Sequence, residues 1–363
     1  MSAAEVPARP TDRLSAARIF REEALREGFA RCGIAAAGEP PGHGRFERWL
    51  DERRHAGMSY LDESRAVRAD PGRLLAGARS VVSLSAPHGS APGRAADGSL
   101  VARYARGADY HGTLRLRAER VARAAAARIA AAFRYRVCVD STPISERSFA
   151  AAAGLGWIGK NCCLIDPERG SYLLLCEILT DLDLPPDEPI AERCGSCRRC
   201  LDACPTDAFV SPGVLDANRC LAYWTIEHRG PLPDGVKEAV GDRVFGCDAC
   251  QEACPWNEPE RDSSEEGARA EAPPAPTRAE WLAMGPGEWR RRFGATALNR
   301  AGRRGVQRNA AASAGCRSEV EASLVPTLVR SARVAEPGLS DSARWALRRL
   351  SSAGAPRRIA FAD

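Results

Sequence analysis

The sequence of 363 residues lacks any long apolar run, and its first 20 residues are polar and charged, without a twin-arginine signal. A secretory signal needs an apolar core, and a membrane-spanning helix needs about 20 consecutive apolar residues. We therefore expect neither export nor membrane insertion, and we predict a cytoplasmic monomer. The length exceeds one ordinary domain, so two or three domains are expected.

Lysine is absent from residues 278–363, which instead hold 16 arginines against seven acidic residues, a formal charge of +9. Because the whole chain carries +5, the remainder must be acidic, at −4. A basic segment on an acidic body suggests a polyanionic partner. Arginine is also common in alanine-rich sequences, so these residues could instead simply solvate a helical array.

Cysteine is abundant, with 14 residues, and eight of them fall in or between two runs. Cys194–Pro205 reads C-x2-C-x2-C-x3-C-P, the spacing that holds [4Fe–4S] clusters in bacterial-type ferredoxins, where the fourth cysteine serves the other cluster. Cys247–Pro255 repeats the ending without its first cysteine, for which Cys220 is the obvious replacement. The predicted ligands are Cys194, Cys197, Cys200 and Cys254 for cluster 1, and Cys204, Cys220, Cys247 and Cys250 for cluster 2.

Two tetrahedral zinc sites are the main alternative, because thiolates also suit zinc. Zinc sites usually pair separated C-x2-C knuckles, however, so the spacing favours clusters. A disulfide framework is disfavoured by the length and by the lack of an export signal. The other six cysteines are interpreted as buried free thiols: Cys32, Cys138, Cys162, Cys163, Cys176 and Cys316.

Strands alternate with helices over about residues 10–185, which predicts an α/β body. The first helix is expected over 12–31, with Thr11 or Asp12 as its cap and Gly33 as its stop. A second helix is predicted over 113–133, and strands over 80–86, 135–140 and 171–180. Residues 188–257 should wrap around metal. Amphipathic segments at about 278–293, 305–315, 317–333 and 338–352 look like stacked helix pairs of the HEAT type.

Asp140 stands where the strand over 135–140 should end, and ligands gather at the carboxyl ends of strands in α/β sheets. An Asp after a strand is, taken alone, more often a helix cap. The glycines at 154, 156 and 159 allow a close backbone approach to something bulky. They follow an alanine-rich helix rather than a strand, so a dinucleotide site is not expected.

His111 belongs to a D-x-H sequence, which begins a motif that supplies a histidine ligand to cobalt in some proteins. The glycine of this chain directly follows the histidine instead of standing further on, so we reject a ligand role for His111. The other four histidines, His43, His55, His88 and His228, show no metal-binding spacing.

The chain resembles the epoxyqueuosine reductase family from about residue 40 onward, in several segments that occur in the right order. These segments are 102–115, 139–161 (VDSTPISERSFAAAAGLGWIGKN), 170–178, 194–209 (CGSCRRCLDACPTDAF), 220–230 (CLAYWTIEHRG), 246–257 (GCDACQEACPWN) and 308–315. Cys176 departs from the family in standing where a small residue is usual, and Cys316 interrupts the last helical region.

The resemblance implies an enzyme that depends on base-off cobalamin and two [4Fe–4S] clusters. Such an enzyme reduces epoxyqueuosine at the wobble position of tRNA to queuosine with loss of water, using an unidentified electron donor. The resemblance further implies four parts of the chain: a cobalamin-binding α/β domain (1–187), a ferredoxin-like module with two clusters (188–257), a linker (258–277) and a HEAT-like tRNA-binding domain (278–363).

The resemblance also implies roles for single residues. Asp140 falls on the catalytic aspartate, which would donate a proton to the epoxide oxygen if burial raised its pKa. The implied cobalamin contacts are Arg68, Asp140, Lys160, Asn161, Leu164, Ser171, Leu175, Tyr223 and Thr225. The implied tRNA contacts are Glu227, Arg300, Arg303, Arg304, Arg308 and Asn309.

Two other functions remain open at this level. A plain electron-transfer protein would leave most of the chain, outside the cysteine-rich module, without a purpose. A cobalamin-dependent reductive dehalogenase would share both kinds of cofactor, but such enzymes normally carry an export signal and have no basic helical tail.

Overall fold

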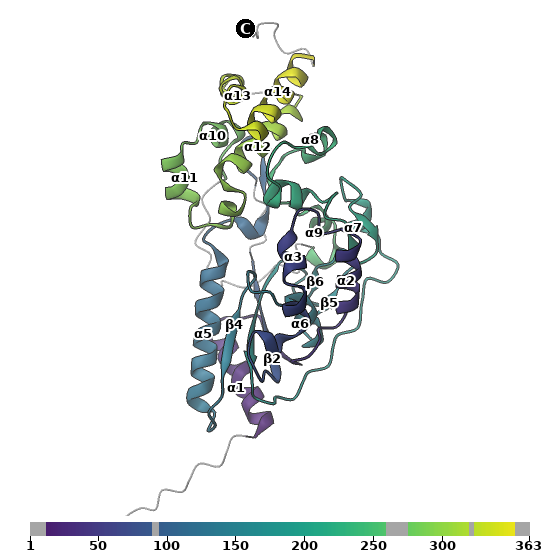
Figure 1. The fold of residues 1–363 in the computed structure, drawn as a ribbon, viewed down its shortest axis with the longest axis vertical. Coiled ribbons are helices and arrows are strands. Elements are labelled where there is room, and N and C mark those ends of the chain that lie inside the picture. Colours follow the sequence, from purple (N-terminus) through teal and green to yellow (C-terminus); the bar gives the residue numbers. More distant parts are fainter. Residues whose placement is uncertain (1–11, 89–93, 259–274, 319–322, 353–363) are drawn as a thin grey trace, which may run out of the picture.

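The computed structural model describes residues 12–88, 94–258, 275–318 and 323–352. The molecule is elongated, with a sheet and two long helices at one end and the C-terminal helices at the other (Figure 1). The cysteine-rich residues lie beside the sheet, on the side away from the long helix α5 (Tyr110–Arg128). The linker predicted over 258–277 falls almost wholly outside the described residues.

The central sheet has four strands in the order β1 (Arg31–Ala36), β2 (Ser80–Pro87), β7 (Leu173–Thr180) and β4 (Tyr135–Cys138). The strands predicted over 80–86, 135–140 and 171–180 are thus confirmed, whereas β1 was missed. Every neighbouring pair is antiparallel. The carboxyl-end rule that singled out Asp140 applies to parallel sheets, so that part of the reasoning was wrong. Alternating helices and strands in a sequence do not determine the direction in which the strands pair.

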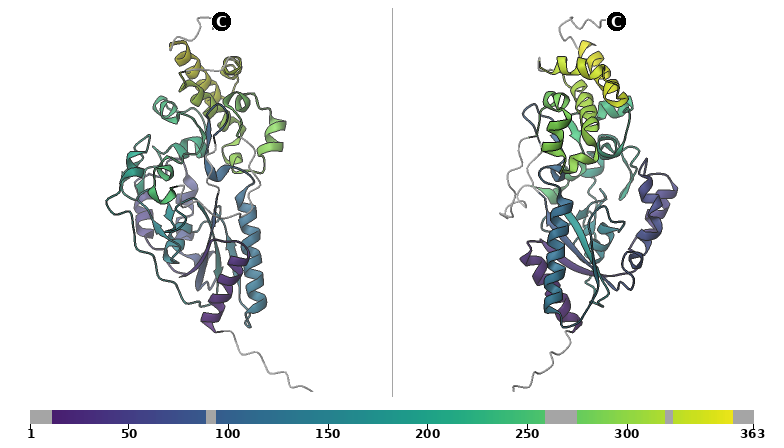
Figure 2. Two further views of the ribbon diagram at one scale, coloured as in Figure 1. Left: turned by 180° about the vertical axis from the view of Figure 1, so that it is seen from behind. Right: turned by 60° about the vertical axis from the view of Figure 1, so that its left-hand side comes forward.

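The two faces of the sheet are covered by different helices (Figure 2). Helix α1 (Arg13–Arg26) and helix α5 pack on one face, in a core that includes Phe20, Val82 and Val121. Helix α6 (Glu146–Ala152) covers the other face through Phe149. The short hairpin of β5 (Trp157–Ile158) and β6 (Leu164–Ile165) follows α6 in the chain.

Helix α1 begins as predicted and ends earlier than predicted. The carboxylate of Asp12 accepts a hydrogen bond from the backbone N–H of Ser15, which satisfies a free donor of the first turn. The helix ends at Arg26, because Gly28 takes a positive φ of 75° and turns the chain into β1. Gly33 therefore lies inside a strand and is not the helix stop.

The remaining elements of the chain before residue 258 are short. They are α2 (His43–Asp51), α3 (Ser59–Glu63), α4 (Arg65–Ala69), β3 (Leu100–Val101), α7 (Arg199–Asp202), β8 (Phe209–Ser211), β9 (Val214–Leu215), the π-helical turn η3 (Tyr223–Glu227), α8 (Asp234–Val240), β10 (Arg243–Phe245) and α9 (Ala249–Glu252), with the 3-10 turns Pro71–Arg73, Arg103–Ala105 and Pro255–Asn257.

The C-terminal helices are α10 (Arg278–Ala283), α11 (Pro286–Phe293), α12 (Gly302–Gly315), α13 (Leu324–Ala332) and α14 (Pro337–Ser352), with the 3-10 turn Ala297–Arg300. The segment predicted over 278–293 is split, because Pro286 starts a new helix. Their core also contains Val101, Ala105, Val244 and Phe245, which come from earlier parts of the chain. The core of the helical unit is therefore continuous with β3, β10 and the turn that contains Ala105.

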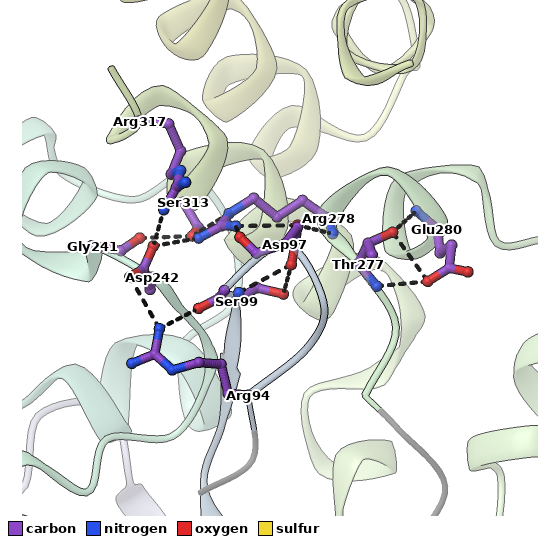
Figure 3. A network of polar contacts seen from close by, with 11 residues as sticks. Arg94, Asp97, Ser99, Gly241, Asp242, Thr277, Arg278, Glu280, Ser313 and Arg317 are labelled. Atoms are coloured by element: carbon purple, nitrogen blue, oxygen red, sulfur yellow. Dashed lines mark hydrogen bonds and ion pairs between the residues drawn. The ribbon is translucent and has the colours of Figure 1, made fainter. Parts of the chain in front are cut away.

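Arg278, the first residue of α10, joins this helical unit to the earlier segments (Figure 3). Its side chain is 1% exposed. The guanidinium forms ion pairs with Asp97 at 3.1 Å and Asp242 at 2.6 Å, and it donates a hydrogen bond to Ser313 at 2.9 Å. A buried arginine with this many acceptors is satisfied, and removing one partner would leave charge uncompensated in the interior.

No helix in the described part of the chain is long and apolar enough to cross a membrane.

Candidate active site and metal centres

Asp140 lies in the turn between β4 and α6, with a positive φ of 40° that is uncommon for a residue other than glycine. Its backbone N–H donates a hydrogen bond to Glu146 at 2.6 Å, which holds the turn against the first residue of α6. Its carboxylate lies 2.6 Å from Nε2 of His111, near the start of α5. The side chain of Asp140 remains 53% exposed, so one carboxylate is both tightly paired and open to a reactant.

His111 is held from both sides. Its Nδ1 lies 2.5 Å from Asp109, whose carboxylate also accepts the backbone N–H of His111 as the cap of α5. The ring of Tyr110 stacks on the imidazole at 4.2 Å, and Tyr104 meets Tyr110 edge to face. Because both ring nitrogens are engaged, His111 has no free nitrogen for a metal, which agrees with the rejection of a ligand role.

The contact between His111 and Asp140 shifts their pKa values in opposite directions. The hydrogen bond to Asp140, together with that to Asp109, raises the pKa of His111 to about 9 against the opposing effect of burial. The same hydrogen bond from His111 lowers the pKa of Asp140. Burial alone would raise the pKa of Asp140, which is the condition set from the sequence, but the hydrogen bond from His111 outweighs it and favours the ionised carboxylate beside a protonated imidazole.

Two further acidic side chains, Glu146 and Glu177, lie in the interior near Asp140. Burial raises the pKa of Glu146 to about 7, and the Asp140 carboxylate adds to this effect. Glu177, on β7, is 0% exposed, and neither of its carboxylate oxygens has a hydrogen-bond partner among the described residues. Burial raises the pKa of Glu177 well above its usual range, with a further contribution from Glu146, and so favours the uncharged form.

Three charged side chains that the sequence singled out, Arg68, Glu227 and Arg300, converge near Asp140. Arg300 forms a two-pronged ion pair with Glu227, with contacts of 2.7 and 2.9 Å, and lies over the ring of Tyr60 at 5.4 Å. Burial raises the pKa of Tyr60, and Glu227, Arg300, Asp140 and Arg68 all act on it. The guanidinium of Arg68 donates to the carbonyl of Ile144 at 3.0 Å, next to the Asp140 turn. The structure thus brings together one predicted catalytic residue, one predicted cofactor contact and two predicted tRNA contacts.

The seven cysteines of the two runs, together with Cys220 between them, are compatible with the two groups that the crossing rule predicts. Burial raises the pKa of Cys200 to about 11, with further contributions from Cys254, Cys194 and Cys197. Burial likewise raises the pKa of Cys220 to about 11, with contributions from Cys247 and Cys204. The pKa of Cys250 is also raised, mainly by a hydrogen bond with Cys163 and by burial, with smaller contributions from Cys247 and Cys220.

Cluster 1 has a cavity of its own, of about 100 Å³, lined by Cys194, Cys197, Cys200 and Cys254. Within the described ranges, no three His, Cys, Asp or Glu side chains converge on a point where a single metal ion could sit. Thiols spread around a cavity fit a polynuclear cluster better than two zinc ions. Cys163, predicted to be a buried free thiol, is a free cysteine and hydrogen-bonds Cys250, which is assigned to cluster 2.

Lys160 and Asn161 lie at this cavity and not at Asp140. Nζ of Lys160 donates to the carbonyls of Gly195 and Cys197, the latter at 2.9 Å, inside the first cysteine run. The bulky group that the three glycines approach is the chain itself. A Cβ on Gly156 would stand 2.2 Å from the carbonyl oxygen of Ile165, and one on Gly154 would stand 2.7 Å from that of Glu188.

The remaining predicted cofactor contacts divide by exposure. Leu164 is buried in the core beneath α6, and Leu175 packs against the same core while staying partly exposed. The hydroxyl of Tyr223 accepts the N–H of Gly57. The side-chain amides of Gln251 and Asn257 donate hydrogen bonds to the hydroxyl of Ser171. The buried hydroxyl of Thr225 donates to the carbonyl of Leu221 and accepts the backbone N–H of Gly246. The polar groups of Ser171 and Thr225 are therefore already satisfied within the chain.

The predicted tRNA contacts on α12 are mostly turned inward. Arg308 is 2% exposed and donates to the carbonyls of Trp224, His228 and Gly230. Asn309 is 0% exposed and donates to the carbonyls of Thr225 and Val244. Neither side chain can reach a phosphate, so these two assignments are corrected. Arg303 donates to Gln307 and to Met284, and only Arg304 is fully at the surface.

Sequence reasoning missed the partners of Asp140. His111 was considered only as a metal ligand, and Asp109, Tyr110 and Tyr104 were given no role. The sequence does place the DYH triplet inside a segment that supported the family resemblance. Nothing in the spacing of 29 residues between His111 and Asp140 shows that the two side chains meet.

Two protein families match parts of this chain. Residues 193–257 match the family described as 4Fe-4S double cluster binding domain. Residues 68–141, which contain Arg68, His111 and Asp140, match the family described as epoxyqueuosine reductase QueG, DUF1730.

Similar proteins cover most of the chain. The epoxyqueuosine reductase of Xanthomonas campestris is 41% identical over 85% of this chain and 89% of that protein. A solved epoxyqueuosine reductase with a tRNA-Tyr epoxyqueuosine-modified stem loop is 30% identical, with a TM-score of 0.78 over 92% of this chain and 90% of that chain. A structure of the Bacillus subtilis enzyme, with its catalytic aspartate loop swung out of the active site, is 29% identical, with a TM-score of 0.80 over the same shares.

Proposed function

Because the chain belongs to the epoxyqueuosine reductase family, oxidoreductases that act on tRNA, we propose that its reaction takes place at Asp140 and His111. The reaction removes the epoxide oxygen of epoxyqueuosine as water, which consumes two electrons and two protons. The observation that carries the proposal is the His111–Asp140 contact of 2.6 Å on a half-exposed carboxylate. The family assignment favours this function over the electron-transfer protein and the dehalogenase.

The protein's own contribution at this site is a positioned proton. The imidazolium of His111 donates its Nε2–H to the carboxylate of Asp140, and Asp109 and Tyr110 hold the ring in that orientation. As negative charge develops on the leaving oxygen, Asp140 passes on the proton that His111 carries. Groups of this kind typically contribute about 10²–10⁴-fold to a rate.

Residues 193–257 match a double 4Fe-4S cluster binding domain, and we propose two [4Fe–4S] clusters as the electron carriers of this chain. We assign Cys194, Cys197, Cys200 and Cys254 to cluster 1, and Cys204, Cys220, Cys247 and Cys250 to cluster 2. The cysteine-rich module, residues 188–257, lies against the sheet domain, residues 1–187. The assignment predicts about eight iron atoms per chain.

Cobalamin, when bound, would supply the two-electron chemistry at carbon that clusters cannot supply one electron at a time. The fit of the chain to this cofactor rests on β7. Leu173 and Leu175, which point to the α6 face of the sheet, are only partly buried, whereas the five residues that follow Leu175 are fully buried. An apolar macrocycle could cover these side chains, and Arg68, Asp140, Leu175 and Tyr223 would hold it. Both nitrogens of His111 are hydrogen-bonded, to Asp109 and Asp140, which disfavours that imidazole as a cobalt ligand; the base-off form of the cofactor is proposed from the family resemblance.

We assign tRNA binding to the helical unit of residues 278–363, a HEAT-like array, together with Glu227 and Arg300 beside the Asp140 site. Arg304 and Arg300 are the exposed arginines among those predicted. The solved relative with an epoxyqueuosine-modified stem loop supports a tRNA substrate.

The test is anaerobic turnover. Protein reconstituted with iron, sulfide and cobalamin is reduced chemically and incubated with tRNA from cells that lack the enzyme. Nucleoside analysis should show epoxyqueuosine converted to queuosine, with loss of one oxygen. Protein that carries its clusters and cobalamin yet leaves the nucleoside unchanged would refute the proposal.

A further inference from the structure

The β5–β6 hairpin, residues 157–165, forms one wall of the cluster 1 cavity. Lys160, Asn161 and Ile165 line that cavity opposite the four cysteines. Lys160 is fixed by its hydrogen bonds to the carbonyls of Gly195 and Cys197, so hairpin and cysteine run are held together. Gly159 is required at the bend, because a Cβ there would stand 2.4 Å from Ile165.

Asn161 carries a hydrogen-bond donor that the protein does not use. The side chain is 5% exposed, and its Oδ1 accepts the backbone N–H of Cys163 at 3.2 Å. This contact orients the amide and leaves Nδ2 on the opposite side. Nδ2 has no hydrogen-bond partner in any described segment of the chain. A buried N–H without an acceptor costs about 1–3 kcal/mol, so such groups normally have a partner.

Trp157 presents a second buried donor on the same hairpin. It is 3% exposed, and its indole ring packs with Cys254, Cys194 and Trp256. Its Nε1 has no hydrogen-bond partner among the residues that the structure describes. The ring packs against Cys194 and Cys254, two of the cysteines assigned to cluster 1.

Both donors therefore belong to side chains at one site: Asn161 lines the cavity together with the four cysteines, and Trp157 packs against two of them. Hydrogen bonds to cluster sulfurs are among the factors that set reduction potentials. The chain uses such a bond elsewhere, since the N–H of Ala208 donates to Sγ of Cys204 at 3.3 Å, in cluster 2.

We propose that Asn161 Nδ2 and Trp157 Nε1 donate hydrogen bonds to the sulfur atoms of cluster 1 and thereby raise its reduction potential. The inference rests on the assignment of a [4Fe–4S] cluster to Cys194, Cys197, Cys200 and Cys254. Reduction adds negative charge to the cluster, and an N–H donor stabilises the more negative state more than the oxidised one. Loss of either donor must then make the potential more negative.

The experiment is a redox titration of the reconstituted full-length protein followed by EPR. Trp157→Phe keeps an aromatic ring and removes only the indole N–H. Asn161→Ser keeps an acceptor for the N–H of Cys163, since serine forms the same local turn more weakly, and removes the amide donor. Trp49→Phe is the matched control, because its indole N–H donates to the carbonyl of Leu215, away from the cavity. Cluster 2 in the same sample is the internal standard.

We expect each of the two variants to make reduction of cluster 1 about tenfold less favourable, since a hydrogen bond to a charged group contributes roughly 1.5–3 kcal/mol. Tenfold corresponds to about 59 mV for a one-electron couple. Cluster 2, and cluster 1 of Trp49→Phe, should keep their potentials. Variants with full iron content and an unchanged cluster 1 potential would overturn the inference while leaving the cluster assignment intact. Wild-type protein that binds no iron would overturn both.

A measurement on the wild-type protein covers the case in which a variant loses its cluster. The protein is grown with tryptophan labelled with ¹⁵N at the indole nitrogen, and the reduced clusters are studied by pulsed EPR. We expect a ¹⁵N coupling to cluster 1 and exchangeable protons that disappear in D₂O. Absence of any ¹⁵N coupling would overturn the role of Trp157.

Discussion

Charged side chains serve different ends in the Asp140 region and in the C-terminal helices. Around Asp140, charges meet one another and stay partly open to solvent, as in the 53% exposed Asp140 and the 33% exposed His111. In the helical unit, Arg278 and Arg308 are buried and bind carbonyls and carboxylates of other segments. The first arrangement leaves a reactive group available, and the second fastens parts of the chain together. A high charge in the sequence therefore does not by itself mark a binding surface.

The largest effect is expected from Asp140→Asn, which tests the chemical side of this comparison. The variant keeps the shape of the side chain but cannot carry the proton of His111, so we expect turnover to fall by about 10²–10⁴-fold. Iron content and cobalamin absorption should match the wild type. Asp183→Asn, at a surface ion pair with Arg13, is the control and should remain active. Activity of Asp140→Asn within tenfold of wild type would place the proton donor elsewhere.

Arg308→Met tests the structural side. The change leaves the carbonyls of Trp224, His228 and Gly230 without their donor in a buried place, and we expect a loss of about 2–3 kcal/mol in the free energy of unfolding. Arg304→Met, on the exposed side of the same helix, should change stability little. Denaturant unfolding of both variants gives the comparison. Equal stabilities would show that burial of Arg308 is not what holds the helical unit in place.

The pH dependence probes the pair at Asp140. The pKa of His111 is raised from 6.5 to about 9 in the folded protein. The pair therefore stabilises the protein below about pH 6.5, and this contribution is lost as the pH rises through about 9. If the imidazolium supplies the proton, kcat should be level below about pH 9 and fall tenfold per unit above it. A fall that begins near pH 6.5 would mean that the two side chains do not share the proton.

The smallest effect concerns Arg300, the exposed arginine that lies between the two regions. Arg300→Ala should weaken tRNA binding several-fold and reduce the slope of log affinity against log salt by about 0.7–0.9, the value for one lost phosphate contact. Arg292→Ala is the matched control, because Arg292 is engaged within its own helix by Glu288 and Phe293 and is not among the predicted tRNA contacts. A salt slope reduced in Arg308→Met but not in Arg300→Ala would restore the assignment made from the sequence.

Some of these features could be predicted and others could not. The cysteine spacing indicated both clusters and the exchange of ligands between the runs, because those ligands are fixed by local sequence. Buried strands such as β2 were visible as β-branched runs. The antiparallel sheet was not, since pairs such as Ser83 and Glu177 come from distant segments. The arginines of α12 were misjudged, because helical spacing shows which residues share a face but not what covers it.

The contacts of Arg278 make the helical unit a fixed reference for the Asp140 region. Arg278 joins that unit to Asp97, and the backbone N–H of Asp109 donates to the carbonyl of Ala295 at 3.2 Å. The segment that carries His111 is thus attached at two points to the C-terminal helices. A substrate bound by the helical unit would therefore lie at a fixed distance from His111. Contacts far from the reacting base would then set how deeply that base enters the site.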